Sequence, residues 1–458
     1  MQNNDLSANK ADLMEKIVSL CKRRGFVFPG SEIYGGMANS WDYGPLGVEL
    51  KNNIKQEWWK RFVQQRDDMV GIDAALIMNP KVWQASGHLQ NFSDPLVECK
   101  KCHFRDRSDH LGFPDLKVEG ISEGFNIPPC PKCGSKDWTA PKQFNLMFQT
   151  FIGPAQEQAN VAYFRPETAQ AMFVDFKNVL DTSRKQLPFG IGQVGKAFRN
   201  EITPGNFIFR TREFEQMEIE YFIKPPQNDE EWNGVFEMWR TEMKTWITEV
   251  LGLKWEHIHE LEVPKDELAH YSKRTIDFEY HFPFGLSELY GLAYRTDFDL
   301  KNHMDASKQD IRYTDPQTGE KFIPHCIEPT WGVDRSVLAV LCEAFDDSNP
   351  ENVLLHLPAK LAPYKAAVFP LLKNKPELVE KAREIYKDLQ KHFNVAWDDR
   401  GNVGKRYYSQ DEIGTPLCVT VDFQSLEDGE VTVRNRDTKD QPRVKISELA
   451  DYIKKSLQ

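Results

Sequence analysis

Four of the eight cysteines form two close pairs that could bind a metal ion. Two residues separate Cys99 from Cys102, and the same spacing separates Cys130 from Cys133. Two thiolates held this way on a tight turn can bind one Zn²⁺, and a second pair completes a closed tetrahedral site. The sequence between the pairs lacks the apolar pattern of an independent core, so we expect structural zinc rather than two unrelated thiol pairs. A site made only of cysteine leaves no open position for water, which argues against a zinc-dependent hydrolase.

A basic run follows the first cysteine pair and contains Arg105 and Arg107. Guanidinium groups beside a zinc knuckle suggest contact with phosphate groups. The alternative is a solvated charged face, which is the usual role of a charge run.

A second group of chemically active residues lies on two expected strands, 191–201 and 207–223, joined by the breaker Thr203-Pro204-Gly205-Asn206. Side chains alternate along a strand, so one face collects an aromatic ring with polar and acidic groups. The residues of this face are Phe214, Gln216, Glu218 and Glu220. Such a face is a poor core and suits a binding site.

Three arginines accompany this hairpin, namely Arg199, Arg210 and Arg212. Their planar guanidinium groups could clamp phosphates. The alternative is an exposed ribbon with arginine–glutamate pairs across the strands.

The stretch Gly190-Ile191-Gly192-Gln193-Val194-Gly195 matches the dinucleotide-binding fingerprint. The fingerprint must follow a buried strand and open a helix that holds pyrophosphate. Here Leu187-Pro188 precedes it and the breaker at 203–206 follows within a dozen residues, so we reject a nicotinamide-dependent enzyme.

The elements that must position these residues have patterns of their own. Leu50, Ile54, Trp58 and Phe62 repeat every four residues, which predicts an amphipathic helix over 46–63. We expect strands at 69–72 and 74–78 and a long helix at 229–251. Past residue 360 strands and helices alternate, which predicts a separate α/β domain.

Composition limits the class of protein. The 458 residues are 40% hydrophobic and 28% charged, too apolar for a disordered chain and too charged for a membrane protein. The start of the chain lacks a secretory signal, so we expect a cytoplasmic protein without membrane contact. The net charge of −11 argues against a surface that is basic throughout, but it leaves room for a local nucleic-acid site.

Motifs along the chain resemble those of a known family. Phe198-Arg199-Asn200-Glu201 with Arg210 and Phe214 resembles motif 2 of class II aminoacyl-tRNA synthetases. Gly332-Val333-Asp334-Arg335, which opens an expected helix at 336–345, resembles motif 3. The finer resemblance is to glycyl-tRNA synthetases of the single-chain, homodimeric class IIa type. It rests on Trp41-Asp42-Tyr43-Gly44-Pro45, Ser86-Gly87-His88, Arg165-Pro166-Glu167-Thr168, the run 213–220, Asp297-Phe298-Asp299-Leu300 and Ile327-Glu328-Pro329-Thr330.

The C-terminal segments 401–407 and 411–416 are similar to the class IIa anticodon-binding domain. Two positions depart from the family. Leu76 stands where motif 1 usually has proline, so motif 1 is assigned only as the helix and strand of 46–78. Thr330 stands where the family often has serine, which keeps the hydroxyl but narrows the pocket.

The resemblance implies an α+β fold: a class II antiparallel-sheet catalytic core with a zinc-knuckle insertion, followed by an α/β anticodon-binding domain. The expected parts are 1–96 (core, motif 1), 97–160 (zinc insertion), 161–358 (core, motifs 2 and 3, with a helical insertion at about 224–285) and 361–458 (anticodon-binding domain).

It also implies the ligation of glycine to glycine tRNA with ATP and Mg²⁺. Arg199 and Arg335 would be catalytic. ATP would contact Arg199, Asn200, Glu201, Phe209, Arg210, Thr211, Arg212, Glu213, Phe214, Glu288, Leu289, Gly332, Val333, Asp334 and Arg335. Glycine would contact Glu167, Phe214, Glu215, Gln216, Met217, Glu218, Glu328, Pro329, Thr330, Trp331 and Gly332. Arg105 and Arg107 would contact substrate or tRNA.

The ammonium group is the handle of an amino acid without a side chain, and Glu167, Glu218 and Glu328 would surround it. Three acids without that cation predict a raised carboxyl pKa in the empty site. The alternative function is a non-catalytic synthetase-like nucleic-acid-binding protein. Such proteins usually lose the motif arginines or the substrate acids, and this sequence keeps both.

Overall fold

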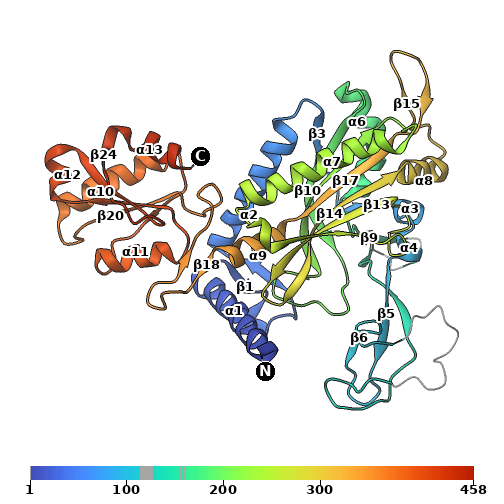
Figure 1. Ribbon diagram of the computed structural model, residues 1–458, viewed down its shortest axis with the longest axis horizontal. Helices are drawn as coiled ribbons and strands as arrows, with labels where there is room; N and C mark the ends of the chain where they lie inside the picture. The colour runs from blue at the N-terminus through green and yellow to red at the C-terminus, as the bar shows by residue number, and fades with distance from the viewer. Residues whose placement is uncertain (1, 114–126, 155–156, 158–159, 458) are drawn as a thin grey trace.

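A seven-stranded sheet forms the centre of the computed structural model, which describes residues 2–113, 127–154, 157 and 160–457 (Figure 1). The strand order is β12-β13-β14-β17-β11-β10-β3. Neighbouring strands are antiparallel except β10 and β3, which are parallel. The strands are β3 (Met69–Ile72), β10 (Phe189–Phe198), β11 (Glu213–Ile223), β12 (Ile258–Glu262), β13 (Arg274–Phe282), β14 (Gly285–Thr296) and β17 (His325–Gly332).

The hairpin β10–β11 confirms the expected pairing but not the full length of its second strand. Residues 207–212 form turns instead, and β11 begins only at Glu213. Asn206 and Phe207 adopt positive φ angles of 55° and 59°, which end extended pairing there. The glycine fingerprint lies inside β10, where a Cβ on Gly190 would lie 2.3 Å from the Met69 sulfur. These glycines therefore allow close strand packing and open no helix.

Three helices cover one face of the sheet: α2 (Pro45–Trp59), α7 (Asp229–Thr245) and α9 (Val333–Ala344). The turns η2 (Lys60–Gln64) and η4 (Trp246–Val250) extend α2 and α7 as π-helices. Trp58, Phe62, Trp246 and Trp331 are fully buried between these helices and the sheet. On the other face, α5 (Ala169–Val174), α6 (Phe176–Ser183) and α8 (Phe298–Ser307) cover only one end. The rest of that face is available for a pocket.

The expected helical insertion at about 224–285 is wrong in its second half. It contains α7 and η4, but β12 and β13 then return to the edge of the central sheet. Ile276, Phe278, Tyr280 and Phe282 are buried at every second position. This period of two is that of a strand with one face in the core.

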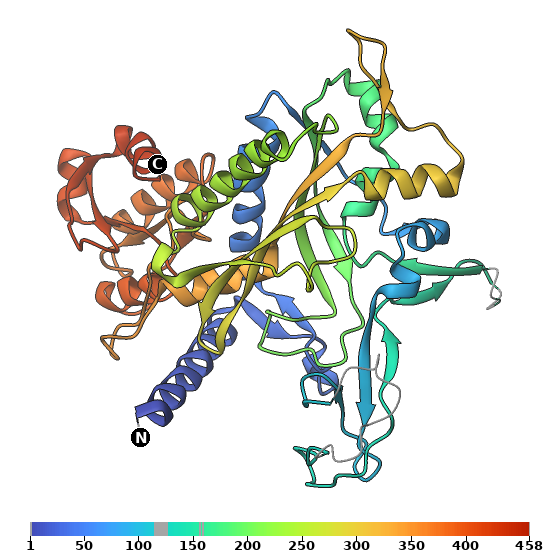
Figure 2. The ribbon, with the colours of Figure 1, turned by 45° about the vertical axis from the view of Figure 1, so that its right-hand side comes forward.

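A smaller module is inserted between β3 and β10 and projects from the body (Figure 2). One of its sheets has the order β6-β5-β7 and the other β4-β9-β8. Residues 114–126 of the expected zinc insertion lie outside the described residues. The elements are β4 (Ile77–Met78), α3 (Pro80–Ala85), α4 (His88–Asn91), β5 (Ser93–Glu98), β6 (Arg105–Arg107), β7 (Lys142–Asn145), β8 (Gln149–Phe151) and β9 (Val161–Phe164).

The C-terminal domain lies beside the body (Figure 1) and has a five-stranded sheet of order β21-β20-β22-β23-β24. The expected α/β alternation is present, with α12 and β24 as additional elements. Its parts are β20 (Ala366–Pro370), α10 (Pro376–Leu389), β21 (Val395–Trp397), α11 (Val403–Asp411), β22 (Leu417–Val421), α12 (Phe423–Asp428), β23 (Glu430–Asn435), β24 (Arg443–Lys445), η6 (Ile446–Glu448) and α13 (Leu449–Ser456).

The N-terminal helix α1 (Gln2–Arg24) reaches this domain, where Arg24 donates to the Ser409 hydroxyl and carbonyl at 3.0 and 3.1 Å. Within the described residues, no helix combines the length and apolar character needed to cross a membrane. The remaining elements are β1 (Val27–Pro29), η1 (Glu32–Tyr34), β2 (Trp41–Tyr43), η5 (Trp255–His257), β15 (Tyr313–Thr314), β16 (Lys321–Phe322), β18 (Phe345–Asp346) and β19 (Leu354–Leu355).

Candidate active site

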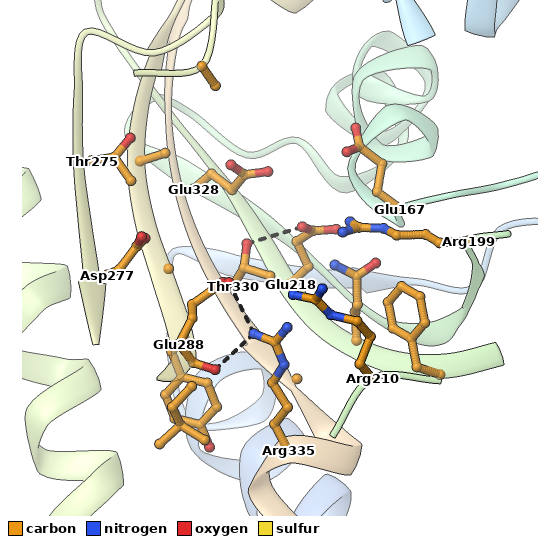
Figure 3. A pocket seen from close by; sticks show the side chains of 18 of the residues that line it. Glu167, Arg199, Arg210, Glu218, Thr275, Asp277, Glu288, Glu328, Thr330 and Arg335 are labelled. Carbon is orange, nitrogen blue, oxygen red and sulfur yellow. Dashed lines mark hydrogen bonds and ion pairs between the residues drawn. The ribbon is translucent and has the colours of Figure 1, made fainter. Parts of the chain in front are cut away.

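A cavity of about 540 Å³ lies on the sheet face that the helices leave open. Side chains of β11, β13, β14 and β17 line it, together with the turn 207–212 and residues before α5 (Figure 3). The residues that were expected to bind ATP or glycine and that line the cavity are Glu167, Arg199, Glu201, Phe209, Arg210, Thr211, Phe214, Glu215, Gln216, Glu218, Glu288, Leu289, Glu328, Thr330, Gly332, Asp334 and Arg335.

A group of buried carboxyl groups lies at one part of this cavity. Glu218 of β11 pairs in register with Thr330 of β17, and the threonine hydroxyl donates to the Glu218 carboxyl group at 3.1 Å. Thr168 donates to its other oxygen. Carboxyl oxygens of Glu218, Glu220 and Glu328 lie within 4.8 Å of one another. Three acids this close repel one another unless protons or cations are shared between them.

Arg295 of β14 supplies part of that compensation, and the sequence reasoning missed it. Its guanidinium group is buried and donates to Glu328 at 2.7 Å. It also forms two hydrogen bonds to Asp299, at 2.8 and 2.9 Å. The position of Arg295 just before the motif 297–300 could have indicated a role in the site. Its partner Glu328, however, is distant in the chain.

The expectation of a raised carboxyl pKa among these acids is confirmed by Glu218 and Glu328. Burial raises the pKa of Glu218, with a further rise from Glu167. Burial also raises the pKa of Glu328 to about 8 although Arg295 opposes the shift. Glu167 differs from them: burial favours its neutral form, but His88, Arg295 and Gln170 together hold its pKa well below the ordinary value.

A cationic part of the cavity lies beside the acids. The Arg199 guanidinium lies 5.3 Å from the rings of both Phe92 and Phe214, and its Nε donates to the Pro166 carbonyl at 3.0 Å. This stacking holds the guanidinium group in one orientation.

Arg335, at the start of α9, contacts the next part of the cavity. It donates to the Glu288 carbonyl at 2.9 Å and lies 3.1 Å from the Glu288 carboxylate. Its guanidinium also covers the Phe209 ring at 4.5 Å. Figure 3 shows Arg210 and Arg335 toward one end of the cavity and Glu167 and Glu328 toward the other.

Asp277 of β13 also lines the cavity and was missed by the sequence reasoning. Burial, together with the nearby Glu288 and Glu279, raises the pKa of Asp277 to about 7. No motif marks it, and it lies on β13, which the sequence analysis expected to be part of a helical insertion.

Seven expected contact residues lie outside the cavity lining: Asn200, Arg212, Glu213, Met217, Pro329, Trp331 and Val333. Met217 and Trp331 point to the opposite sheet face, where Trp331 packs 4.9 Å from Phe62. Each neighbours a pocket residue in sequence, and alternation of side chains sends it to the other side. Arg212 instead donates to the Ala38 carbonyl at 3.1 Å.

Asp334 lines the cavity, but its oxygens are already paired. The buried Lys51 ammonium lies 2.9 Å from it, the Tyr43 hydroxyl donates at 2.5 Å, and the Glu215 backbone N–H donates at 2.7 Å. Asp334 therefore joins α2, β11 and α9 and fixes the start of the helix that carries Arg335.

The four cysteines of the two pairs come together, with all four sulfurs within 4.8 Å of one another. The sulfurs of Cys99 and Cys133, and those of Cys102 and Cys130, are 3.6 Å apart. A tetrahedral site with Zn–S bonds of about 2.3 Å has sulfur–sulfur edges of about 3.8 Å, so the arrangement fits Zn²⁺. Both knuckles also turn alike, since His103 and Gly134 follow them with φ angles of 57° and 69°.

Of the two arginines beside the first cysteine pair that were expected to contact substrate or tRNA, only one lines the cavity. Arg107 lines the cavity and pairs with Asp94 at 2.9 Å and Asp109 at 2.7 Å. Arg105 is outside the lining, exposed, and paired with Glu98 at 2.6 Å.

Two family models match the chain. The tRNA synthetase class II core domain (G, H, P, S and T) matches residues 150–344, and the anticodon binding domain matches residues 365–456. An antiparallel sheet that carries motif arginines over a cavity, followed by such a domain, defines a class II aminoacyl-tRNA synthetase.

Similar proteins show to which family of class II synthetases the chain belongs. The chain is 53% identical to the glycine-tRNA ligase of Geobacillus thermodenitrificans (strain NG80-2), over 100% of this chain and 99% of the relative. It is 54% identical to that of Alkaliphilus oremlandii (strain OhILAs) and 53% identical to that of Caldanaerobacter subterraneus subsp. tengcongensis, over 97% of this chain and 98% of each relative. The chain belongs to the glycine-tRNA ligase family, as its motifs predicted.

Proposed function

We propose that this chain joins glycine to the 3′ end of glycine tRNA in two steps within the cavity. First, a glycine carboxylate oxygen attacks the α-phosphorus of ATP and pyrophosphate leaves. A terminal hydroxyl of the tRNA then takes the glycyl group from glycyl-adenylate and releases AMP. One observation carries the proposal: Arg210 and Arg335 lie toward one end of the cavity, and the acids Glu167 and Glu328 lie toward the other (Figure 3). That separation suits a substrate pair with phosphates at one end and an ammonium at the other.

The arginines would neutralise charge on the phosphates. Arg199, held between two rings, would contact the α-phosphate, where negative charge is shared with the attacking oxygen. Arg335 and Arg210 would hold the outer phosphates. Phe214 would stack on adenine, and Glu201 would accept from its amino group. Because the protein does little covalent work, positioning and charge neutralisation supply most of the acceleration.

Mg²⁺ would bind together with the ATP phosphates. Glu288 fits such an ion, because its carboxylate lines the cavity and Arg335 holds its pKa below the ordinary value, so an ionised oxygen ligand is available. The bound ion would supply further neutralisation of phosphate charge.

The acids would bind the ammonium of glycine. Glu218 and Glu328 face the cavity from neighbouring strands, and Glu167 faces it from the segment before α5. Thr330 bounds the position of the α-carbon. Attraction distinguishes one methylene by only about 1–3 kcal/mol, so alanine must be rejected by clash with these walls.

The remaining parts have proposed roles away from the chemistry. The cysteine knuckles would hold structural Zn²⁺, and Arg107 with Arg105 would contact tRNA. The domain that matches the anticodon binding domain would bind the anticodon of the tRNA. A homodimer stays our expectation from the resemblance. Ile33 and Tyr34, which are 88% and 87% exposed, offer apolar surface that a second copy would cover.

Glycine-dependent exchange of labelled pyrophosphate into ATP tests the proposal. We expect exchange with glycine and none with alanine at equal concentration, without tRNA. A purified, folded chain that binds nucleic acid but shows no exchange would support the non-catalytic alternative. That alternative is disfavoured because one cavity contains Arg199, Arg335 and all three acids.

A further inference from the structure

The motif Ser86-Gly87-His88 has no role in the proposed reaction, yet it lies at the edge of the cavity. It connects α3 to α4, and His88 is the first residue of α4. The His88 side chain is only 11% exposed, and its Nε2 lies 3.3 Å from a Glu167 carboxylate oxygen. A histidine is thus directed at one of the three acids from the side away from the cavity.

Ser86 and two neighbouring aromatic rings hold the imidazole ring of His88 in place. The Ser86 hydroxyl lies 2.7 Å from His88 Nδ1, and the rings of Trp83 and Phe92 pack at 5.6 and 5.4 Å. Gly87 has a φ angle of 84°, a left-handed conformation that favours glycine. Serine orients the ring, glycine makes the turn, and histidine presents Nε2 to the carboxylate.

The proton on that nitrogen follows from its neighbours. Ser86 Oγ can either donate to Nδ1 or accept from it while donating to the Trp83 carbonyl at 3.4 Å. In both arrangements Nε2 carries hydrogen toward Glu167, because an ionised carboxylate only accepts. Gln170 donates to the other Glu167 oxygen at 3.0 Å. Both oxygens are held on the outer side, and each retains a lone pair for the cavity.

Glu167 requires such support because its neighbours are also acids. Glu218 and Glu328 both interact unfavourably with its charge. Without a donor behind it, a buried carboxylate beside two others either turns away or takes up a proton. Either change removes an acceptor for an ammonium group.

We infer that His88 is a positioning residue for the amino-acid site: it holds Glu167 ionised and directed at the ammonium of glycine. The inference rests on the proposed function. It predicts that loss of the imidazole weakens glycine binding far more than ATP binding, because His88 lies directly against Glu167 but reaches Arg199 only through the Phe92 ring, which packs against both.

Pyrophosphate exchange with the full chain tests the inference through two variants. His88→Phe keeps the ring between Trp83 and Phe92 but removes both nitrogens, while His88→Gln restores a donor. We expect His88→Phe to raise KM for glycine about tenfold to a hundredfold, as for a lost charge-assisted hydrogen bond. KM for ATP should stay within about twofold, and His88→Gln should show a smaller rise. The matched control is His259→Gln, which removes a histidine–glutamate pair of 2.8 Å on β12.

A double-mutant cycle separates positioning from general damage. If His88 acts through Glu167, His88→Phe should cause no further rise of KM for glycine in a Glu167→Gln background. Additive rises, equal rises for glycine and ATP, or a change below twofold in His88→Phe would overturn the inference. Should His88→Phe not fold, a change below twofold in His88→Leu, which also removes both ring nitrogens, would do so. Absence of glycine-dependent exchange in the unchanged chain would instead refute the proposed function.

Discussion

Replacing Glu218 with glutamine removes one negative charge from the amino-acid site without changing its volume. Glu218 is only 2% exposed. The hydroxyl groups of Thr168 and Thr330 donate to its carboxyl oxygens. The glutamine amide presents one acceptor where the carboxylate presents two. One threonine must therefore find another partner, or its donor is left unpaired.

The magnitude follows from these contacts. Loss of one partner of a buried, hydrogen-bonded charge pair costs about 2–5 kcal/mol. Glu167 and Glu328 stay in place and retain part of the ammonium interaction, so we expect the lower part of that range. At 1.4 kcal/mol per factor of ten, a loss of about 2–4 kcal/mol lowers kcat/KM for glycine about thirtyfold to a thousandfold.

The assay is glycine-dependent pyrophosphate exchange at saturating ATP, with ATP affinity measured separately by calorimetry. ATP affinity should stay within about twofold of the unchanged chain. Glu262→Gln is the matched control, because Glu262 is an exposed carboxylate held by Arg274 at 2.8 Å on β12. An unchanged glycine kcat/KM in Glu218→Gln, or an equal loss of ATP affinity, would refute the assignment of this acid to the ammonium.

Three further outcomes are expected. Arg199→Ala should lower kcat about a hundredfold to a thousandfold in single-turnover adenylate formation, and a loss below tenfold would contradict its place at the α-phosphate. Since the pKa of Glu328 is about 8 in the empty site, binding an ammonium must release its proton. KM for glycine should therefore fall as pH rises from about 7 to 8.5, by up to about tenfold per unit; a flat profile would contradict this. Trp331→Ala should destabilise the core by about 3–5 kcal/mol in denaturant unfolding, and a loss below 1 kcal/mol would contradict its burial.

Local patterns in the sequence predicted much of the fold. Apolar residues four apart predicted α2, and the two cysteine pairs predicted a cluster that the structure brings together. These signals are short-range, because one turn of helix or one knuckle places its side chains independently of the rest of the chain. The second half of the region 224–285 was misassigned because the strong helix α7 dominates its pattern and the strands β12 and β13 give weaker signals.

The family motifs also located the cavity, but tertiary structure selected its members. Alternation along β11 and β17 determines that Met217 and Trp331 face away when Glu218 and Thr330 face the cavity. The sequence shows only that adjacent residues of a strand point to opposite faces of the sheet. Only packing against α2 and α9 decides which of them is inside.

By itself the sequence determined the family, and it singled out the motif arginines, the three acids proposed to bind glycine and the two cysteine pairs, because each is a matter of residue type and spacing. The tertiary structure alone placed Arg295 against Glu328 and directed His88 at Glu167. The physical reason is that charge compensation in a buried site acts over a few ångströms. The groups that provide it come from segments that are distant along the chain and meet only when the sheet assembles.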